Sequence, residues 1–289
     1  MRWPPYEHIF FDCDSTLTAV EGIDILAEMV GKKWRVEVLT NAAMDGKLDL
    51  ADVYAKRLQA IKPTAEQIRD IRRIYKRHVV EDAREVIAAL HALGHQVYII
   101  SGGLAEPVAE FGVHLGVPRD HIRAVHVDYN QLTGRWWETT PTETDSIESG
   151  RYLDYEEGAL TISDGKAHIV RELLGEQHGR TILIGDGSSD LLAGKAVDLF
   201  VGYGGVVERQ RVRREAPVFM HTPSLSPLLL LAAGPAAGRL LQNTPHARTF
   251  EKGYQLIQTG ALSFNHDKLE SKFFQAISAT YQTVHSGAD

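Results

Sequence analysis

Short apolar runs alternate with longer amphipathic segments along most of the chain. The runs are rich in β-branched residues and mostly end at Gly, Asp or Ser, which is typical of buried strands. They lie at His8–Phe11, 96–100, 124–127, 181–184, 199–201 and Val218–Met220. Segments with helical periodicity lie at 82–93, 104–115, Lys166–Leu174 and 190–196. Strands that alternate with helices predict an α/β fold: a doubly wound, mostly parallel sheet with both faces covered.

The segment 22–79 breaks this alternation, because it holds helical patterns and no run typical of a strand. Helices are predicted at Lys33–Met44, Leu50–Ile61 and 64–77. Pro63-Thr64 is typical of a helix start, with Glu66 and Gln67 in the first turn. An all-helical insert directly after the first strand predicts a cap over the mouth of the sheet. The alternative is a helical hairpin packed on one sheet face.

Two later segments also depart from the alternation. Residues 128–163 are polar, contain several glycines and surround Trp136-Trp137, which predicts a long hairpin or loop excursion. Residues 235–289 hold helical patterns at Ala247–Gln258 and 267–284. These helices are expected to form either a homodimerisation element or additional packing on the core. We therefore divide the chain into a core (1–20 and 80–234), a helical cap (21–79) and a C-terminal helical extension (235–289).

Charge and cysteine content limit the classes of binding partner and the cellular compartment that we expect for this protein. The formal net charge of −7 argues against nucleic-acid binding, which needs a basic face, but is compatible with a small anionic substrate. Cys13 is the single cysteine, so a disulfide within the chain is excluded and a cytoplasmic location is expected. The N-terminal segment lacks the apolar run of a signal peptide. The apolar stretch 225–241 is interrupted by prolines and Arg239, which argues against a membrane helix.

Acidic residues follow two of the predicted strands directly. Asp12 and Asp14 come after the first strand, and Asp186 and Asp190 come after the strand at 181–184. The carboxyl ends of parallel strands meet at the edge where α/β proteins bind ligands. Mg²⁺ in proteins is commonly held by one or two carboxylates together with a substrate phosphate. The pattern favours a Mg²⁺ site, although each aspartate pair alone is also typical of a turn or helix cap.

Two further features are typical of an anion site. Ser101-Gly102-Gly103 lies where a strand passes into a helix, so its hydroxyl and backbone N–H groups can cradle a phosphate. Lys166 begins a predicted helix, a place that disfavours a cation, so we expect it to neutralise a phosphate and the aspartates. The alternative for Lys166 is a solvated surface lysine. Cys13 lies between two aspartates and is expected to point away from them into the core.

The order Asp-x-Asp, Ser, Lys, Asp-x-x-x-Asp resembles that of the haloacid dehalogenase superfamily of phosphohydrolases, over residues 9–220. The resemblance implies that Asp12 is the nucleophile and forms a phosphoaspartate, while Asp14 acts as general acid and then as base. It also implies a Mg²⁺ site made by Asp12, the Asp14 carbonyl and Asp186, and supported by Asp190 and Ser189. The implied phosphate ligands are Ser101, Gly102 and Lys166. Ser189 stands where the family often has Asn.

The segments 12–27 and 43–58 are similar to phosphoserine phosphatases within that superfamily. This resemblance implies that Glu21 binds the substrate ammonium, Arg57 binds its carboxylate and Met44 packs on the substrate. The expected reaction is Mg²⁺-dependent hydrolysis of L-phosphoserine in serine biosynthesis. Two alternatives stay open: a phosphatase of the same fold for another small metabolite, such as a sugar phosphate or phosphorylated alcohol, and a non-catalytic binding protein on this fold.

Overall fold

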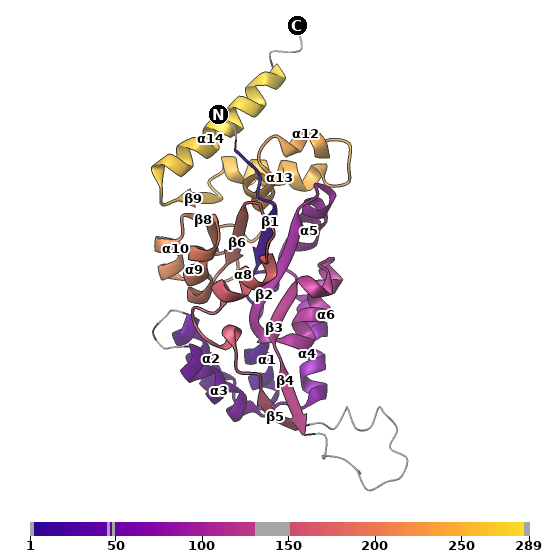
Figure 1. Ribbon diagram of the computed structural model, residues 1–289, viewed down its shortest axis with the longest axis vertical. Coiled ribbons are helices and arrows are strands. Elements are labelled where there is room, and N and C mark those ends of the chain that lie inside the picture. The colour runs from indigo at the N-terminus through magenta and orange to yellow at the C-terminus, as the bar shows by residue number, and fades with distance from the viewer. Residues whose placement is uncertain (1–2, 45–46, 48–49, 131–150, 286–289) are drawn as a thin grey trace.

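The computed structural model describes the 289-residue chain except for residues 1–2, 45–46, 48–49, 131–150 and 286–289. Its centre is a seven-stranded sheet in the order β3-β2-β1-β6-β7-β8-β9 (Figure 1). The strands are β1 (His8–Phe11), β2 (Gln96–Leu104), β3 (Ile122–Val125), β6 (Thr181–Gly185), β7 (Leu199–Tyr203), β8 (Val218–Met220) and β9 (Leu262–Phe264). All neighbours pair in parallel except β8 and β9, so the predicted doubly wound, mostly parallel sheet is confirmed.

The register of the central strands brings distant residues to one edge of the sheet. Every residue of β1 and β6 is buried, as expected for apolar strands covered on both faces. Phe11 lies opposite Ile99 of β2 on one side and Ile184 of β6 on the other. The residues that directly follow these positions, around 12, 101 and 186, therefore meet at the carboxyl edge.

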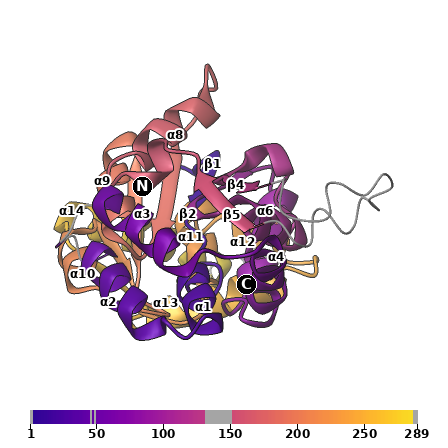
Figure 2. The same ribbon diagram turned by 90° about the horizontal axis from the view of Figure 1, so that it is seen from below.

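Helices pack against the strands to complete the layers (Figures 1 and 2). They are α5 (Ala83–Ala92), α6 (Ala105–Leu115), α8 (Lys166–Leu174), α9 (Ser188–Ala193) and α10 (Gln210–Glu215). The sequence predicts the first four within a few residues of their observed bounds. It misses α10, a short helix with a single buried residue, Val212.

The predicted strand at 124–127 is wrong as a single element. Its residues fall at the end of β3 and at the start of β4 (Val127–Asn130), which pairs antiparallel with β5 (Arg151–Tyr155) in a separate two-stranded sheet. The chain leaves the main sheet between these strands, and a continuous apolar run does not reveal such a break. The hairpin predicted in 128–163 is confirmed at its base, while residues 131–150 lie outside the described part of the chain.

Four helices follow β1 and lie beyond the carboxyl edge of the sheet (Figures 1 and 2). They are α1 (Gly22–Met29), α2 (Lys33–Met44), α3 (Leu50–Ile61) and α4 (Ala65–Arg77). The predicted start of α4 is confirmed: Thr64 Oγ1 accepts from the Gln67 backbone N–H at 3.2 Å, and Gln67 Oε1 accepts from the Thr64 N–H at 2.9 Å. This reciprocal pair is a capping box, which satisfies two backbone N–H groups at the helix start.

The C-terminal segment packs on the opposite end of the sheet (Figure 1). It contains α11 (Pro227–Ala233), α12 (Ala237–Leu241), α13 (Ala247–Gln258), β9 and α14 (Asp267–His285). The leucines of α11 are buried, so this part of the apolar stretch 225–241 forms a core helix, whereas Leu240 on α12 is exposed. Among the described residues, no helix is both long and apolar enough to span a bilayer.

The sequence predicts neither the short helix α12 nor the strand β9 of the extension. The three residues of β9 pair antiparallel with β8, so Leu262 lies opposite Met220. Three residues are too few to show a strand period. The extension therefore supplies an edge strand to the main sheet, in addition to its two predicted helices.

Candidate active site

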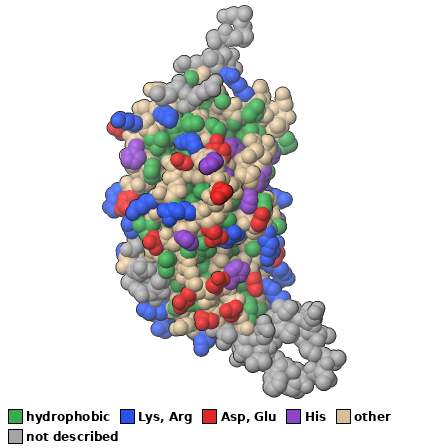
Figure 3. Space-filling model, viewed as in Figure 1, with side chains coloured by type: hydrophobic (Ala, Val, Ile, Leu, Met, Phe, Trp, Pro, Cys, Tyr) green, Lys and Arg blue, Asp and Glu red, His purple; other side chains and the backbone are tan. Residues whose placement is uncertain are grey.

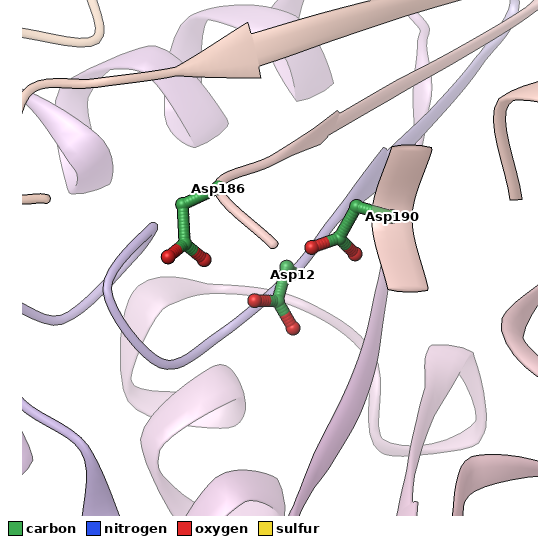
Figure 4. Close-up of side chains that lie close together, drawn as sticks. All are labelled: Asp12, Asp186 and Asp190. Atoms are coloured by element: carbon green, nitrogen blue, oxygen red, sulfur yellow. The ribbon is translucent and has the colours of Figure 1, made fainter. Parts of the chain in front are cut away.

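A cavity of about 50 Å³ lies at the carboxyl ends of β1 and β2, between the sheet and α3. Its lining includes Asp12, Asp14, Glu21, Tyr54, Arg57, Ser101, Gly102, Gly103, Lys166 and Ser189. Nearly all residues singled out from the sequence therefore converge on one space, although they are spread over more than half of the chain. Asp186 and Asp190 lie beside Asp12 (Figure 4). The side chain of Met44 lies outside the described part.

Lys166 joins two buried carboxylates at the floor of this site. Its Nζ lies 2.5 Å from Asp12 Oδ1 and 2.7 Å from Asp190 Oδ1, and all three side chains are at most 5 % exposed. Burial alone would lower the pKa of Lys166, but the adjacent Asp12 and Asp190 raise it above its usual value. Lys166 is thus a buried cation, and the alternative of a solvated surface lysine is excluded.

The carboxylates of Asp12, Asp186 and Asp190 approach one another within 4.8 Å (Figure 4). Burial raises the pKa of Asp12 well above its usual range, and the Asp190 carboxylate adds to that effect. Asp190 is held in place: its Oδ2 accepts from the Gly187 N–H at 3.1 Å, and a side chain at Gly185 would lie 2.2 Å from its Cγ. The glycine at 185 therefore makes room for this carboxylate.

The residues present fit a divalent cation. Asp186 Oδ2 accepts from Arg209 Nε at 2.9 Å, whereas Asp186 Oδ1 is buried and has no hydrogen-bond partner. A buried carboxylate oxygen without a donor is costly unless a cation binds it, and oxygen ligands suit Mg²⁺. Asp12 and Asp186 are the side chains that would hold the ion. The Asp14 carboxylate is not part of this cluster.

The strand-to-helix junction after β2 forms the next wall of the cavity. β2 runs to Leu104, with an irregular register after Ile100, and α6 begins at Ala105. Ser101 Oγ accepts from the Gly103 N–H at 2.9 Å, while the Tyr54 hydroxyl donates to the Gly102 carbonyl at 2.9 Å. These bonds fix the backbone of the turn beside Asp12, as the predicted phosphate cradle requires.

Two further charged side chains, one anion and one cation, line the cavity. Glu21 Oε1 accepts from Ser15 Oγ at 2.7 Å and lies 3.8 Å from Arg209 Nη2. Arg57 is buried on α3, and its Nη1 donates to Thr40 Oγ1 at 3.1 Å, whereas its Nε has no partner. Neither Glu21 nor Arg57 is an ordinary surface charge, because both side chains line the cavity.

Three residues near the site are missed by the sequence analysis. Tyr54 lines the cavity, Tyr75 donates to Asp14 Oδ1, and Arg209 is bonded to Asp186. Arg209 lies beyond the carboxyl end of β7, which is a signal, but it stands among Glu208, Gln210 and Arg211 and resembles a solvated run. Tyr54 and Tyr75 occupy apolar positions of amphipathic helices, where a sequence indicates only core packing.

Thermal unfolding with and without Mg²⁺ should depend on pH through these carboxyls. Burial raises the pKa of Asp186 to about 7 and that of Asp14 to about 8. Without a cation, the folded state then holds protons that the unfolded state has released above about pH 4, so stability falls as the pH rises through this window. A bound cation favours the ionised carboxylates. We expect saturating Mg²⁺ to raise the melting temperature more at about pH 8 than at about pH 5.5.

The melting temperature in Mg²⁺ minus that in EDTA, taken at each pH, removes the contribution of groups that titrate outside the site. Asp186→Asn is expected to lose the gain from Mg²⁺. Asp198→Asn is the matched control, because its carboxylate accepts from Thr181 Oγ1 at 2.9 Å away from the cluster and should leave the gain intact. An equal gain at both pH values, or a full gain in Asp186→Asn, would contradict a cation bound by these carboxylates.

Comparison with known proteins agrees with this site. The family model of the haloacid dehalogenase-like hydrolases matches residues 9–195. Phosphoserine phosphatase of Mus musculus is 32% identical over 210 residues, which are 72% of this chain and 86% of that protein. The chloroplastic phosphoserine phosphatase of Arabidopsis thaliana is 33% identical over 218 residues, 74% of this chain and 68% of that protein.

A solved structure described as a phospho-aspartyl intermediate analogue of phosphoserine phosphatase shares the fold. It has a TM-score of 0.63 and 23% identity, over 78% of this chain and 98% of that chain. The chain belongs to the haloacid dehalogenase-like hydrolases. Within that family it is a phosphomonoesterase, as the sequence predicts, and the alternative of a non-catalytic binding protein is set aside.

Proposed function

We propose that this enzyme hydrolyses L-phosphoserine to L-serine and phosphate in a Mg²⁺-dependent reaction. One observation carries the proposal: a single cavity is lined by the buried Asp12–Lys166 pair and also by Glu21 and Arg57. A phosphate monoester with both an ammonium and a carboxylate matches these charges in sign. The sequence similarity to phosphoserine phosphatases supports the same substrate.

Asp12 is the proposed nucleophile. One of its carboxylate oxygens attacks phosphorus, the bond from phosphorus to the seryl oxygen breaks, and a phosphoaspartate forms. Lys166, 2.5 Å from Asp12 Oδ1, favours the ionised form of the attacking group and so opposes the effect of its burial. Ser101, Gly102 and Lys166 stabilise the charge on the phosphoryl oxygens. When bound, Mg²⁺ would offset the repulsion between Asp12 and the phosphate.

Asp14 is the proposed general acid and base. Burial raises its pKa to about 8, so it holds a proton near neutral pH and can give it to the leaving seryl oxygen. The resulting carboxylate then takes a proton from the water that attacks the phosphoaspartate, which restores Asp12 and releases phosphate. Both half-reactions therefore use one carboxyl in its two protonation states.

The substrate end of the cavity suits an amino acid. The Arg57 guanidinium has an unpartnered Nε and is anchored through Nη1 by Thr40, which itself donates to Asp24 Oδ1 at 3.0 Å. A guanidinium held in this way can bind a carboxylate without first losing side-chain freedom. Glu21 supplies the partner for the ammonium, and Met44 is proposed to pack on the substrate.

The helices α1–α4 are the proposed cap, residues 21–79, over a core of residues 1–20 and 80–234. α2 contacts the core beside the site, where Ser188 Oγ donates to the Ala43 carbonyl at 3.1 Å. A cap in this position shields the reaction from water and brings Glu21 and Arg57 to the substrate. The extension 235–289 contributes no residue to the cavity lining given above.

Partners other than a small phosphorylated metabolite are not part of the proposal. Acidic and basic side chains are interspersed on the face shown in Figure 3, and the cavity is lined by side chains of both signs. We retain the prediction that the enzyme does not bind nucleic acid. A cytoplasmic location and a homodimer through the tail helices also stay predictions; Cys13 is a buried free thiol.

The test compares phosphate release from L-phosphoserine, O-phosphoethanolamine and a panel of sugar phosphates, in Mg²⁺ and in EDTA. We expect Mg²⁺-dependent turnover with L-phosphoserine preferred, and a loss of about 10²-fold in kcat/KM for it in Arg57→Ala, because a charged hydrogen bond is removed. O-phosphoethanolamine lacks the carboxylate, so the same change should leave its kcat/KM nearly unaltered.

Lys56→Ala is the matched control, since Lys56 is exposed on the same helix. If the unaltered enzyme prefers a sugar phosphate, the assignment of L-phosphoserine as the substrate is wrong, but the proposed catalysis by Asp12 and Asp14 still stands. An equal loss for both amine substrates in Arg57→Ala would remove Arg57 from carboxylate recognition.

A further inference from the structure

Tyr75 brings a hydroxyl from α4 to the back of Asp14. Its side chain is fully buried, and its hydroxyl donates to Asp14 Oδ1. Tyr75 is not among the residues that line the cavity. It therefore contacts Asp14 from outside the cavity.

The backbone of α1 is shaped around this hydroxyl. A Cβ at Gly22 would lie only 2.3 Å from Tyr75 Oη, so the glycine is needed to admit the tyrosine. The Gly22 N–H points to the other oxygen of Asp14, Oδ2, at 3.4 Å. The two carboxyl oxygens thus have different partners and cannot exchange places without loss of the stronger bond.

Asp14 Oδ2 is the oxygen beside the proposed phosphate cradle. A Cβ at Gly103 would lie 3.2 Å from Asp14 Oδ2, 3.1 Å from Ser101 Oγ and 3.1 Å from Val108 Cγ2, so both oxygens border the Gly103 turn. Ser101 and Gly103 belong to the turn that lines the cavity. A proton on Oδ2 is therefore directed at the substrate, and a proton on Oδ1 would be directed at Tyr75.

The packing of α4 on α6 fixes the position of the Tyr75 side chain relative to Asp14. Arg72 and Lys76 bind the two oxygens of Glu110 on α6 at 2.7 and 2.9 Å. The Tyr75 ring meets Phe111 of α6 edge-on, with centroids 5.4 Å apart. The position of the hydroxyl is therefore set by the packing of α4 against α6.

We propose that Tyr75 is a positioning residue for Asp14: by donating to Oδ1, it places the transferable proton on Oδ2. The inference rests on the proposed role of Asp14 as general acid. In the first half-reaction this proton passes from Oδ2 to the leaving oxygen as the P–O bond breaks and the Asp12–phosphorus bond forms. In the second, Oδ2 takes a proton from the attacking water. Tyr75 keeps its own proton throughout.

Tyr75→Phe tests this role through the dependence on the leaving group. An alkyl phosphate such as L-phosphoserine needs a proton on its departing oxygen, whereas p-nitrophenyl phosphate releases a stable anion. We expect kcat/KM for L-phosphoserine to fall by about 10- to 100-fold and that for p-nitrophenyl phosphate by less than about threefold, since only the former uses the acid fully. Inhibition by inorganic phosphate should be unchanged, because the phosphate cradle is intact.

Tyr98→Phe is the matched control. Its hydroxyl is also buried and bonded, 3.3 Å from Gln177 Oε1 and 3.3 Å from His8 Nδ1, but at the other end of the sheet. Both variants lose one buried hydroxyl bond, so a comparable change in melting temperature is expected. Only Tyr75→Phe should separate the two substrates.

A second pair of variants keeps the inference testable if Tyr75→Phe is unstable. Gly22→Ala should displace the hydroxyl and reproduce the selective loss for alkyl phosphates. Gly22→Ala combined with Tyr75→Phe should be no worse than either single variant, since the clashing atom is gone. Equal losses for both substrates, or additive losses in the double variant, would overturn the positioning role.

Failure of the proposed substrate can be told apart from failure of this inference. If the unaltered enzyme does not hydrolyse L-phosphoserine, the same comparison is made between whichever alkyl phosphate it accepts and p-nitrophenyl phosphate. A loss that is selective for that alkyl phosphate supports the positioning role of Tyr75, even though L-phosphoserine is then not the substrate. An equal loss for both compounds contradicts the positioning role and says nothing about which substrate the enzyme prefers.

Discussion

Asp12→Asn is expected to reduce phosphate release by at least about 10⁴-fold, because an amide cannot attack phosphorus as a carboxylate does. Among the residues that the structure describes, Asp12 is the one carboxylate that both contacts Lys166 and lines the cavity beside the proposed phosphate cradle. Its replacement by the isosteric amide leaves Asp190 as the partner of Lys166. The fold should therefore persist, and the loss should lie in kcat.

Acid-quenched reactions give the decisive readout for this variant. The unaltered enzyme should carry an acid-stable phosphoryl group during turnover, and Asp12→Asn should carry none. Asp198→Asn serves again as the control carboxamide and should behave as the unaltered enzyme does. Activity above about 1% in Asp12→Asn, with mass spectrometry showing that the amide has not reverted to Asp, would refute the nucleophile.

Lys166→Met is expected to cost about 10²- to 10³-fold in kcat, the effect of removing one preorganised charge from a phosphoryl-transfer site. It should also shift the acid limb of the pH–rate profile. Attack requires ionised Asp12, and Lys166 is the cation that favours this form. Without it the pKa of Asp12 rises further, so the rate increases with pH only at higher pH values.

Stability should fall in the same variant, by about 3 kcal/mol in the free energy of unfolding, because two buried carboxylates lose their shared cation. Denaturant unfolding measures this directly. Lys195→Met is the matched control, since Lys195 is exposed shortly after α9. A pH–rate profile that keeps its position in Lys166→Met would show that Lys166 does not set the ionisation of Asp12.

The aspartates were predictable because of where parallel strands end, and Lys166 because it begins a helix, a place that disfavours a cation. Asp12 and Asp186 follow apolar runs that could only be buried strands, and the carboxyl ends of such strands share one edge. Glu21 and Arg57 were different, since their local sequence shows only charged positions on helices. They came from the resemblance to phosphoserine phosphatases, and the structure then placed both side chains on the cavity wall.

Tyr75 and β9 show what sequence patterns leave out. Tyr75 lies on the buried stripe of α4, so its period indicates core, and only the docking of α4 on α6 brings its hydroxyl to Asp14. β9 is too short to have a period, and it becomes a strand by pairing with β8. In both, the decisive contact joins segments that are far apart in the chain, and no local pattern records it.

The place of β9 at the end of the sheet has a consequence for protein synthesis. Ribosomes build a chain from its N-terminus, so every side chain of the site, from Asp12 to Arg209, emerges before Leu262. Until α13 follows, the leucines of α11 lack their cover, and until β9 follows, β8 is an edge strand with unpaired N–H and C=O groups. A product truncated before Leu262 would hold a full set of catalytic residues on an aggregation-prone body. The nascent chain is therefore prone to aggregate at a stage when all of its catalytic residues have been synthesised but β9 has not yet paired with β8.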